Sequence, residues 1–175
     1  MNEVIKALKE RRSIRKFKPE LPSRADLEQI IDAGLYAASG MGKQSAIVIA
    51  VTDKALRDKI SDDNRKILGA DEGFDPFYGA PVILLVLADK SVATHIYDGS
   101  LMLGNLMNAA HSLGLGSIWI HRCREEFEQE EYAQMLADLG IEGDYEGIGH
   151  LAVGYVDGDA PAPAPRRDGR VYWCE

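Results

Sequence analysis

The sequence predicts one domain of the α/β or mixed α+β class, because helix and strand candidates alternate along the chain. Apolar residues make up 46% of the 175 residues, enough to bury a sizeable core. Two apolar runs, residues 47–51 and 81–88, have the length of buried strands. Amphipathic segments flank these runs, so helices are expected to cover a sheet.

Residue spacing and helix-breaking residues predict the first three elements. Residues 1–9 place their apolar side chains on one face of a helix. Two prolines follow, so residues 13–19 are expected to be extended. Ser23 can cap a second helix, with Asp26 at its third position, and this helix is predicted to reach residue 37.

The middle of the chain is predicted to hold two strands and a helix between them. A loop over residues 38–45 leads into the strand at 47–51. Residues 53–64 have the spacing of an amphipathic helix, and residues 69–80 are expected to be irregular. Residues 81–88 are apolar on both faces, which is typical of a strand in a sheet covered on both sides.

The last third of the chain is predicted to contain two helices, two strands and an extended arm. The helices are expected over residues 95–113 and 125–139, each ended by glycine. The strands are expected over 117–120 and 147–155. The arm, residues 159–175, begins with alternating prolines and ends in an aromatic tail that must pack on its own domain or on a partner chain.

Composition excludes several classes of function. The chain has 20 basic and 28 acidic residues, a net charge of −8, which argues against general nucleic-acid binding. No apolar run approaches the roughly 20 residues of a membrane helix, and charges interrupt any signal-peptide core near the start. The two cysteines form no disulfide framework, so we expect a cytoplasmic protein with free thiols.

A cationic cluster is the first candidate site. Residues 9–18 hold six of the 20 basic residues, which indicates a specific anionic ligand on an otherwise acidic protein. In an extended segment Arg11, Ser13 and Arg15 would point to the same side, and two guanidinium groups with a hydroxyl suit a phosphate. The alternative is a solvated basic face at a helix C-terminus.

Two glycine-containing segments are weaker candidates. The loop with Ser39, Met41 and Gln44 joins a helix to a strand, where ligands often bind, but it could be an ordinary turn. Residues 114–122 lack the G-x-G-x-x-G spacing of a nucleotide fingerprint, and taken alone they are a helix stop and a core strand.

Other reactive side chains are interpreted as structural. His121 and His150 have no ligand set near them in the sequence, so no metal is expected. Cys123 is interpreted as a packed thiol. The acidic pairs at 62–63 and 125–126 are interpreted as solvated faces.

Several segments, in this order, resemble the nitroreductase family of FMN oxidoreductases. They are RRSIRKF at 11–17, AASGMGKQ at 37–44, FYGAPVILLV at 77–86, DGSLMLGNLMNAAHSLGLGSIWI at 98–120, and an ending that contains GY, PAPAPRR and W. The resemblance covers nearly the whole chain. It implies a single α+β domain over residues 1–175, built as a three-layer sandwich with a mainly antiparallel sheet flanked by helices.

The resemblance also implies a homodimer with FMN at the interface and an arm that reaches over the partner. Arg11, Ser13 and Arg15, joined by Arg12, match phosphate and ribityl contacts. Ser39 and Met41 match a loop from the other subunit, and Gln44 a polar flavin or ribityl contact. Ser117, Ile118 and Trp119 match the strand beside the isoalloxazine, with His121 and Arg122 near the ring. Arg166, or its neighbour Arg167, matches a basic residue that closes on the phosphate.

The chain departs from the family pattern at three positions of the loop. Gly42 stands where the familiar loop has Asn, and Ser45-Ala46 where it has Pro-Trp. A lid insertion between the third and fourth helices is also expected to be missing. The pocket shape and the choice of substrate are therefore open.

The function implied is hydride transfer from NAD(P)H through the flavin N5 to an electron-poor acceptor, such as a nitroaromatic or a quinone, with ping-pong kinetics. This scheme needs no side-chain acid or base, and none is assigned. The alternatives are a specialised flavin reaction (reductive dehalogenation or flavin fragmentation), a non-catalytic FMN-binding dimer, and an interaction protein that has lost flavin.

Overall fold

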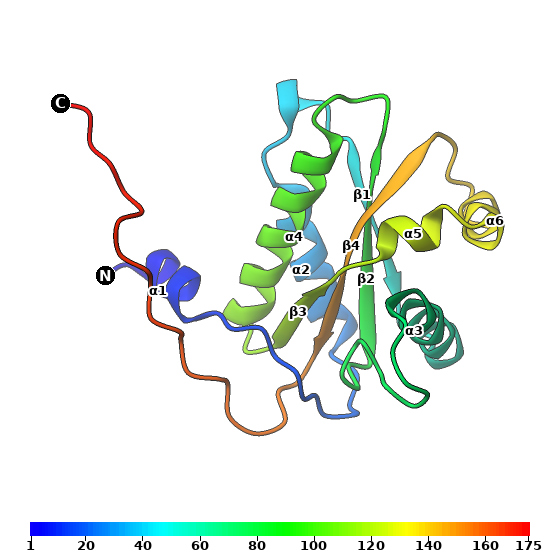
Figure 1. The fold of residues 1–175 in the computed structure, drawn as a ribbon, viewed down its shortest axis with the longest axis horizontal. Coiled ribbons are helices and arrows are strands. Elements are labelled where there is room, and N and C mark those ends of the chain that lie inside the picture. Colours follow the sequence, from blue (N-terminus) through cyan, green and yellow to red (C-terminus); the bar gives the residue numbers. More distant parts are fainter.

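Four strands form one antiparallel sheet at the centre of the molecule, with helices on both faces (Figure 1). The computed structural model describes residues 1–175. The strands are β1 (Ala46–Val51), β2 (Val82–Asp89), β3 (Gly116–Ile120) and β4 (Tyr145–Gly154), in the spatial order β1-β2-β4-β3. Every neighbouring pair is antiparallel, so the class is α+β and the α/β alternative is wrong.

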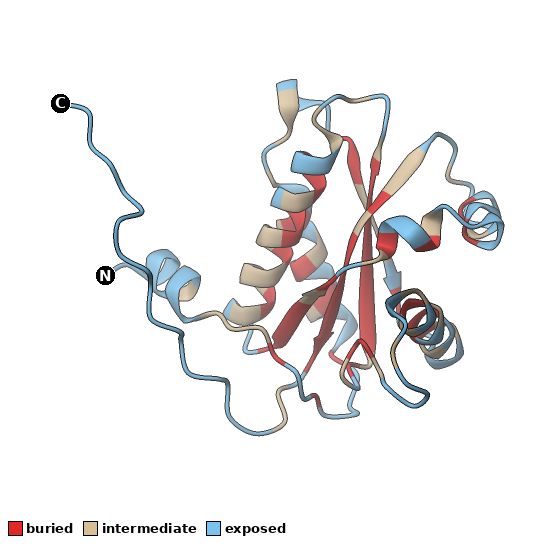
Figure 2. Ribbon diagram, viewed as in Figure 1, coloured by how far each residue is buried: buried red, intermediate tan, exposed pale blue.

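Two apolar clusters lie on opposite faces of the sheet, so the molecule has three layers. One face is covered by α2 (Arg24–Leu35) and α4 (His95–Ser112), and the other by α3 (Lys54–Leu68), α5 (Cys123–Phe127) and α6 (Glu130–Asp138). β2 is buried on both sides from Val82 to Ala88, which confirms the prediction for this run (Figure 2). β3 is an edge strand of this sheet.

The predicted helix over 125–139 is wrong, because the structure has two helices there, α5 and α6. Glu126, Tyr132 and Leu136 are all buried. In a straight helix, positions 126 and 132 would lie about 120° apart around the helix axis, so both could be buried only at the two margins of a wide apolar face. The break after residue 127 lets α5 and α6 each direct its own buried side chains towards the sheet.

The helix predicted over 53–64 extends further, to Leu68. Gly69 ends it in the left-handed conformation, with φ of 70°, and its N–H donates to the carbonyl groups of Arg65 and Lys66. A glycine at this position stops the helix without the steric penalty of a side chain.

The two ends of the chain lie away from the sheet. α1 (Glu3–Glu10) has no buried residue, and the arm after β4 runs past it as an irregular segment (Figure 1). Trp173 in the tail is 83% exposed, so the tail does not pack on its own domain. No helix is both long and apolar enough to cross a membrane.

Candidate functional site

The segment after α1 is attached to the outer edge of β3. Ser13 forms a parallel bridge with Ser117, and the Ile14 N–H donates to the Ser117 carbonyl at 3.1 Å. The Ile14 side chain is buried in the core. These contacts hold the basic cluster beside the amino-terminal end of β3.

Arg11 and Ser117 have buried polar atoms without a partner in the chain. They are Arg11 Nη1 and Ser117 Oγ, and both residues line a cavity of about 220 Å³. Burial, together with the neighbouring Arg12, lowers the pKa of the Arg11 guanidinium. A buried donor without an acceptor is costly, and an anion in the cavity would supply the acceptor.

Arg12 has a different environment. Its Nη1 donates to the carbonyl oxygens of Lys9 at 2.7 Å and of Arg11 at 2.8 Å. Arg12 therefore caps the carboxyl end of α1, as the alternative of a basic helix terminus predicts for this residue.

Ser13 and Arg15 line a neighbouring cavity of about 270 Å³ rather than that of Arg11. The two cavities share Ile14 and Val156 as lining residues. The Arg15 guanidinium lies 6.0 Å from the centre of the Tyr78 ring. The structure therefore divides the predicted cluster between two adjoining cavities.

The loop with Ser39, Met41 and Gln44 has an unusual backbone. Met41 and Gln44 have φ values of 53° and 50°, and Gly42 has φ of 66°. The Gln44 N–H donates to Ser39 Oγ at 3.0 Å. Met41 is 88% exposed, so the loop directs this side chain away from its own domain.

The buried Asp98 of α4 anchors this loop through hydrogen bonds. Its carboxylate accepts hydrogen bonds from the Gly40 N–H at 3.0 Å, from Ser45 Oγ at 2.6 Å and from Thr94 Oγ1 at 3.1 Å. Burial alone would raise the pKa of Asp98, but these donors, Ser45 first, lower it below its usual value. Gly40 permits this contact, because a Cβ there would lie 2.2 Å from Thr94 Oγ1.

β3 contributes an open strand edge to the candidate site. Ser117 directs its carbonyl outward to Ile14, and by alternation the backbone groups of Trp119 face the same edge. The Ile118 side chain is buried in the core, and its backbone faces β4, where it pairs with Ala152. The Trp119 ring stacks on His121, with centres 5.7 Å apart, and its Nε1 is buried without a partner.

Similarity to known proteins covers the chain from the end of α1 to the end of β4. A family model described as Nitroreductase matches residues 8–155. The chain belongs to the nitroreductase family. It is 35% identical over 146 residues to an FMN reductase [NAD(P)H] from Bacillus subtilis, with 71% of this chain and 56% of the relative covered. It is 31% identical to an oxygen-insensitive NADPH nitroreductase from Salmonella typhimurium, with coverages of 73% and 57%.

A solved structure matches the nitroreductase-family chain over its full length. A nitroreductase with bound FMN from Bacteroides fragilis aligns over 100% of both chains, with a TM-score of 0.91 and 25% identity. The alignments to the B. subtilis and S. typhimurium relatives, by contrast, span little more than half of the length of those proteins.

The turn after β3 carries His121 and Arg122, and the structure directs the two side chains differently. His121 is exposed beside Trp119. Arg122 adopts φ of 76°, and its Nε donates to Asn64 Oδ1 at 3.0 Å. Arg122 therefore uses one of its donors within the protein.

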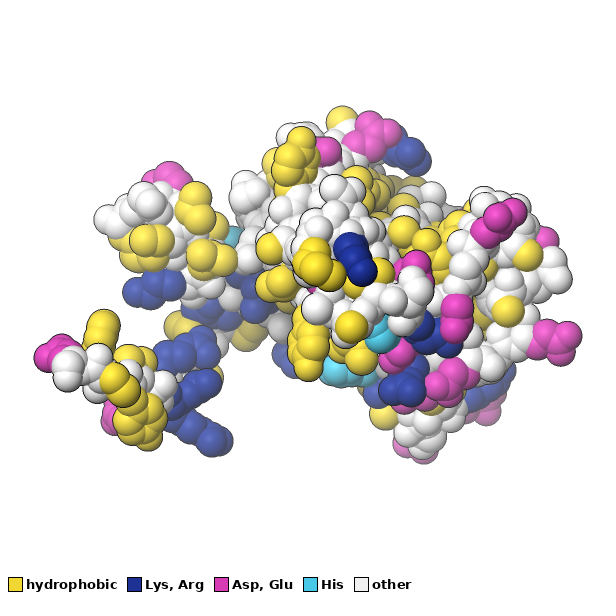
Figure 3. All heavy atoms as spheres, turned by 90° about the horizontal axis from the view of Figure 1, so that it is seen from above, with side chains coloured by type: hydrophobic (Ala, Val, Ile, Leu, Met, Phe, Trp, Pro, Cys, Tyr) yellow, Lys and Arg dark blue, Asp and Glu magenta, His cyan; other side chains and the backbone are white.

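Arg166 and Arg167 lie on the exposed arm. Figure 3 shows basic side chains gathered along α1 and the arm, at the end of the molecule away from α6. Within one chain, the arm brings neither arginine into the cavity of Arg11, whose lining residues end at Ala160.

A group of buried side chains contradicts two predictions from the sequence. Glu126 and His150 are both fully buried, with Oε2 and Nε2 2.5 Å apart, so the solvated interpretation is wrong for Glu126. Asp63 is also largely covered and accepts a hydrogen bond from the Tyr132 hydroxyl. His150 does have potential ligand atoms near it, from Cys123 and Glu126, all within 4.8 Å of one another.

Proposed function

We propose that this chain is an FMN-dependent oxidoreductase that transfers hydride from NAD(P)H to an electron-poor acceptor, such as a nitroaromatic or a quinone. The observation that carries the proposal is the pair of buried, unpartnered polar atoms of Arg11 and Ser117 in one cavity at the open edge of β3. The names of the B. subtilis and S. typhimurium relatives and the FMN in the B. fragilis structure support the same chemistry.

The residues at the edge of β3 fit FMN. The Arg11 guanidinium lacks an acceptor and would hold the phosphate, with Ser13 and Arg15 from the adjoining cavity at the phosphate and ribityl chain. Outward-facing backbone groups of β3 offer donors and acceptors to a planar polar ring. Trp119, His121 and Arg122 would lie near that ring.

We further propose that the site is completed by a second copy of the chain in a homodimer. The loop directs Met41 into solvent although Asp98 fixes its base, which is typical of a contact made with a partner. Ser39, Met41 and Gln44 would then contact the FMN bound mainly by the other subunit. The arm would cross to the partner and bring Arg166, or its neighbour Arg167, to the phosphate.

Bound FMN supplies the hydride acceptor and donor at its N5 position. NAD(P)H and the acceptor are proposed to occupy the same open face in turn, which predicts ping-pong kinetics. The chain's residues bind and orient both, and positive charge from the basic cluster favours an anionic cofactor. When the acceptor is a quinone, it gains one hydride that originates from NAD(P)H and one proton from solvent. The products are a hydroquinone and NAD(P)⁺.

The test is steady-state oxidation of NADH and NADPH by the FMN-loaded protein with a nitroaromatic and a quinone. We expect parallel lines in double-reciprocal plots when the two substrates are varied together. A protein that binds FMN stoichiometrically but oxidises neither nucleotide with any acceptor would contradict the enzymatic proposal and favour a non-catalytic flavin-binding protein.

A further inference from the structure

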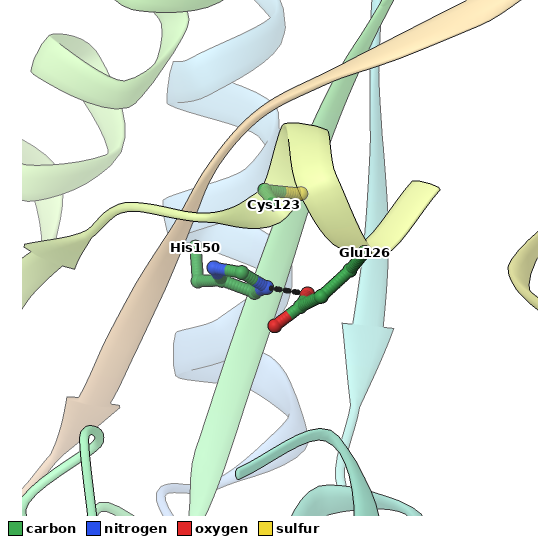
Figure 4. A group of neighbouring side chains, drawn as sticks. All are labelled: Cys123, Glu126 and His150. Carbon is green, nitrogen blue, oxygen red and sulfur yellow. Dashed lines mark hydrogen bonds and ion pairs between the residues drawn. The ribbon is translucent and has the colours of Figure 1, made fainter. Parts of the chain in front are cut away.

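A chain of buried hydrogen bonds runs beneath the turn between β3 and α5. Glu126 of α5 and His150 of β4 meet between the sheet and the helix, with Oε2 and Nε2 2.5 Å apart (Figure 4). Both side chains have no exposed surface. They lie on the sheet face opposite α2 and α4, where the His150 and Phe77 rings form a T-shaped pair with centres 5.2 Å apart.

The hydrogen bonds continue from Glu126 to the backbone of the turn. Glu126 Oε1 accepts from Asn64 Nδ2 at 2.8 Å, and the same amide donates to the His121 carbonyl at 2.9 Å. Asn64, on α3, has no exposed surface either. On the other side, His150 Nδ1 lies 3.4 Å from the Ile120 carbonyl oxygen. Buried side chains therefore contact two consecutive carbonyl groups of the turn, those of Ile120 and His121.

The turn needs this support because its own backbone is unfavourable. Arg122 adopts φ of 76°, a left-handed conformation that is unfavourable for a residue with a side chain. α5, which follows, has only five residues and cannot be stable alone. Arg122 Nε donates to Asn64 Oδ1, which ties the residue in this conformation to the same amide.

We propose that Asn64, Glu126 and His150 are positioning residues that fix the β3–α5 turn, and with it the ring of His121 against Trp119, at the edge where FMN binds. This inference rests on the function proposed above. None of the three side chains touches the cofactor in this account. They act through the carbonyl groups of Ile120 and His121.

The charge state of the pair suits this role. Burial by itself would lower the pKa of His150, but the Cys123 sulfur and the Glu126 carboxylate raise it to about 10. With the imidazole protonated, Nε2–H donates to Glu126 and Nδ1–H points to the Ile120 carbonyl. A buried carboxylate that loses one of its partners is left uncompensated. Replacing Asn64, Glu126 or His150 should therefore loosen the turn.

The test compares Glu126→Gln with Glu125→Gln in the full-length protein. Glu125 lies on the same helix and is exposed, so the control makes the same change one position away. Hydrogen exchange is followed in the peptide that covers residues 116–127, and FMN affinity is measured by titration. We expect exchange in the turn to rise by about tenfold or more in Glu126→Gln. We also expect the dissociation constant for FMN to rise by about fivefold or more. The control and the peptide of β1 should stay unchanged.

Asn64→Ser gives a second variant if Glu126→Gln fails to fold. It removes the link to His121 but leaves the pair of Glu126 and His150 in place, and the same two effects are expected. Unchanged exchange in the turn would overturn the proposal, and so would faster exchange with unchanged FMN affinity. Stoichiometric zinc in the purified protein would also overturn it, because a metal would replace the hydrogen bond between Glu126 and His150. A wild-type protein that does not bind FMN would refute the proposed function, whereas the exchange measurement would still report whether the turn is anchored.

Discussion

Arg11 is the residue whose environment points most directly to a missing ligand. The fold buries one of its guanidinium nitrogens, gives it no acceptor, and places a second arginine beside it. Arg12, one residue later, donates to the carbonyl groups of Lys9 in α1 and of Arg11 just after it. The sequence predicts a basic cluster here, but it cannot separate the two roles, because both arginines line the same cavity and only the folded backbone gives Arg12 its two carbonyl acceptors.

Replacing Arg11 should weaken FMN binding. Arg11→Ala removes a charge-assisted hydrogen bond to the phosphate, and we expect a loss of about 1.5–3 kcal/mol in binding free energy, measured by fluorescence titration. Arg24→Ala is the control, because Arg24 is exposed on α2 and pairs only with Glu28. Equal affinities for the two variants would remove Arg11 from the phosphate site.

Asp98 is a second residue whose role sequence reasoning missed. Two of its three partners, at positions 40 and 45, are distant in the sequence, so no local pattern identifies its role in the loop. At pH 7, Asp98→Asn should lower the free energy of unfolding by about 1–3 kcal/mol, because the loop loses a charged acceptor.

The effect of Asp98 should depend on pH in a defined direction. Its folded pKa is lowered, so its contribution to stability is present above the unfolded pKa of about 3.9 and is lost as the pH falls through the folded pKa. Urea denaturation at pH 7 and at pH 3 should show the difference between wild type and Asp98→Asn shrinking at pH 3. Asp71→Asn, at an exposed position, should show no comparable difference, and a constant gap would argue against an ionised Asp98.

At the scale of elements, apolar runs predicted the strands well and periodicity predicted the helices less well. The run at 81–88 is buried as β2, and the segments at 47–51, 117–120 and 147–155 overlap β1, β3 and β4. The break between α5 and α6 was missed because it depends on Glu126, whose partners lie on α3 and β4. A charged residue in a helical pattern is usually solvated, and only the tertiary structure reverses that interpretation.

Close contact between β3 and β4 gives a prediction at this scale. A Cβ at Gly149 would lie 2.2 Å from Trp119 Nε1, so Gly149→Ala must displace the indole ring. We expect a loss of about 1–3 kcal/mol in unfolding free energy. The change should also shift the emission of Trp119 in a Trp173→Phe background, where it is the sole tryptophan. Unchanged stability and emission would show that the position of the Trp119 ring does not require a glycine at residue 149.

At the scale of the whole molecule, several apolar side chains of α1, α4 and the arm remain exposed. Val4 and Leu8 of α1, Tyr97 and Leu101 of α4, and Trp173 of the arm are at least half exposed. An isolated domain seldom leaves so much apolar surface uncovered. These side chains are the surface that the proposed homodimer would bury.

Removing the arm tests the dimer. Deletion of residues 160–175 should weaken self-association, because the aromatic side chains of the tail, Tyr172 and Trp173, are more than four-fifths exposed within one chain. Sedimentation velocity over a range of concentrations should show the truncated protein dissociating at higher concentration than the full-length chain. An unchanged profile would mean that the arm does not hold two subunits together.

The central claim, that the basic cluster binds the phosphate of a flavin, is tested most directly by comparing FMN with riboflavin. Both ligands carry the same ring and ribityl chain, and only the phosphate differs. We predict that the full-length protein binds FMN at least about tenfold more tightly, since one charge-assisted hydrogen bond contributes about 1.5–3 kcal/mol. Equal affinities for the two flavins would contradict the account, because Arg11 would then have no part in recognising the cofactor.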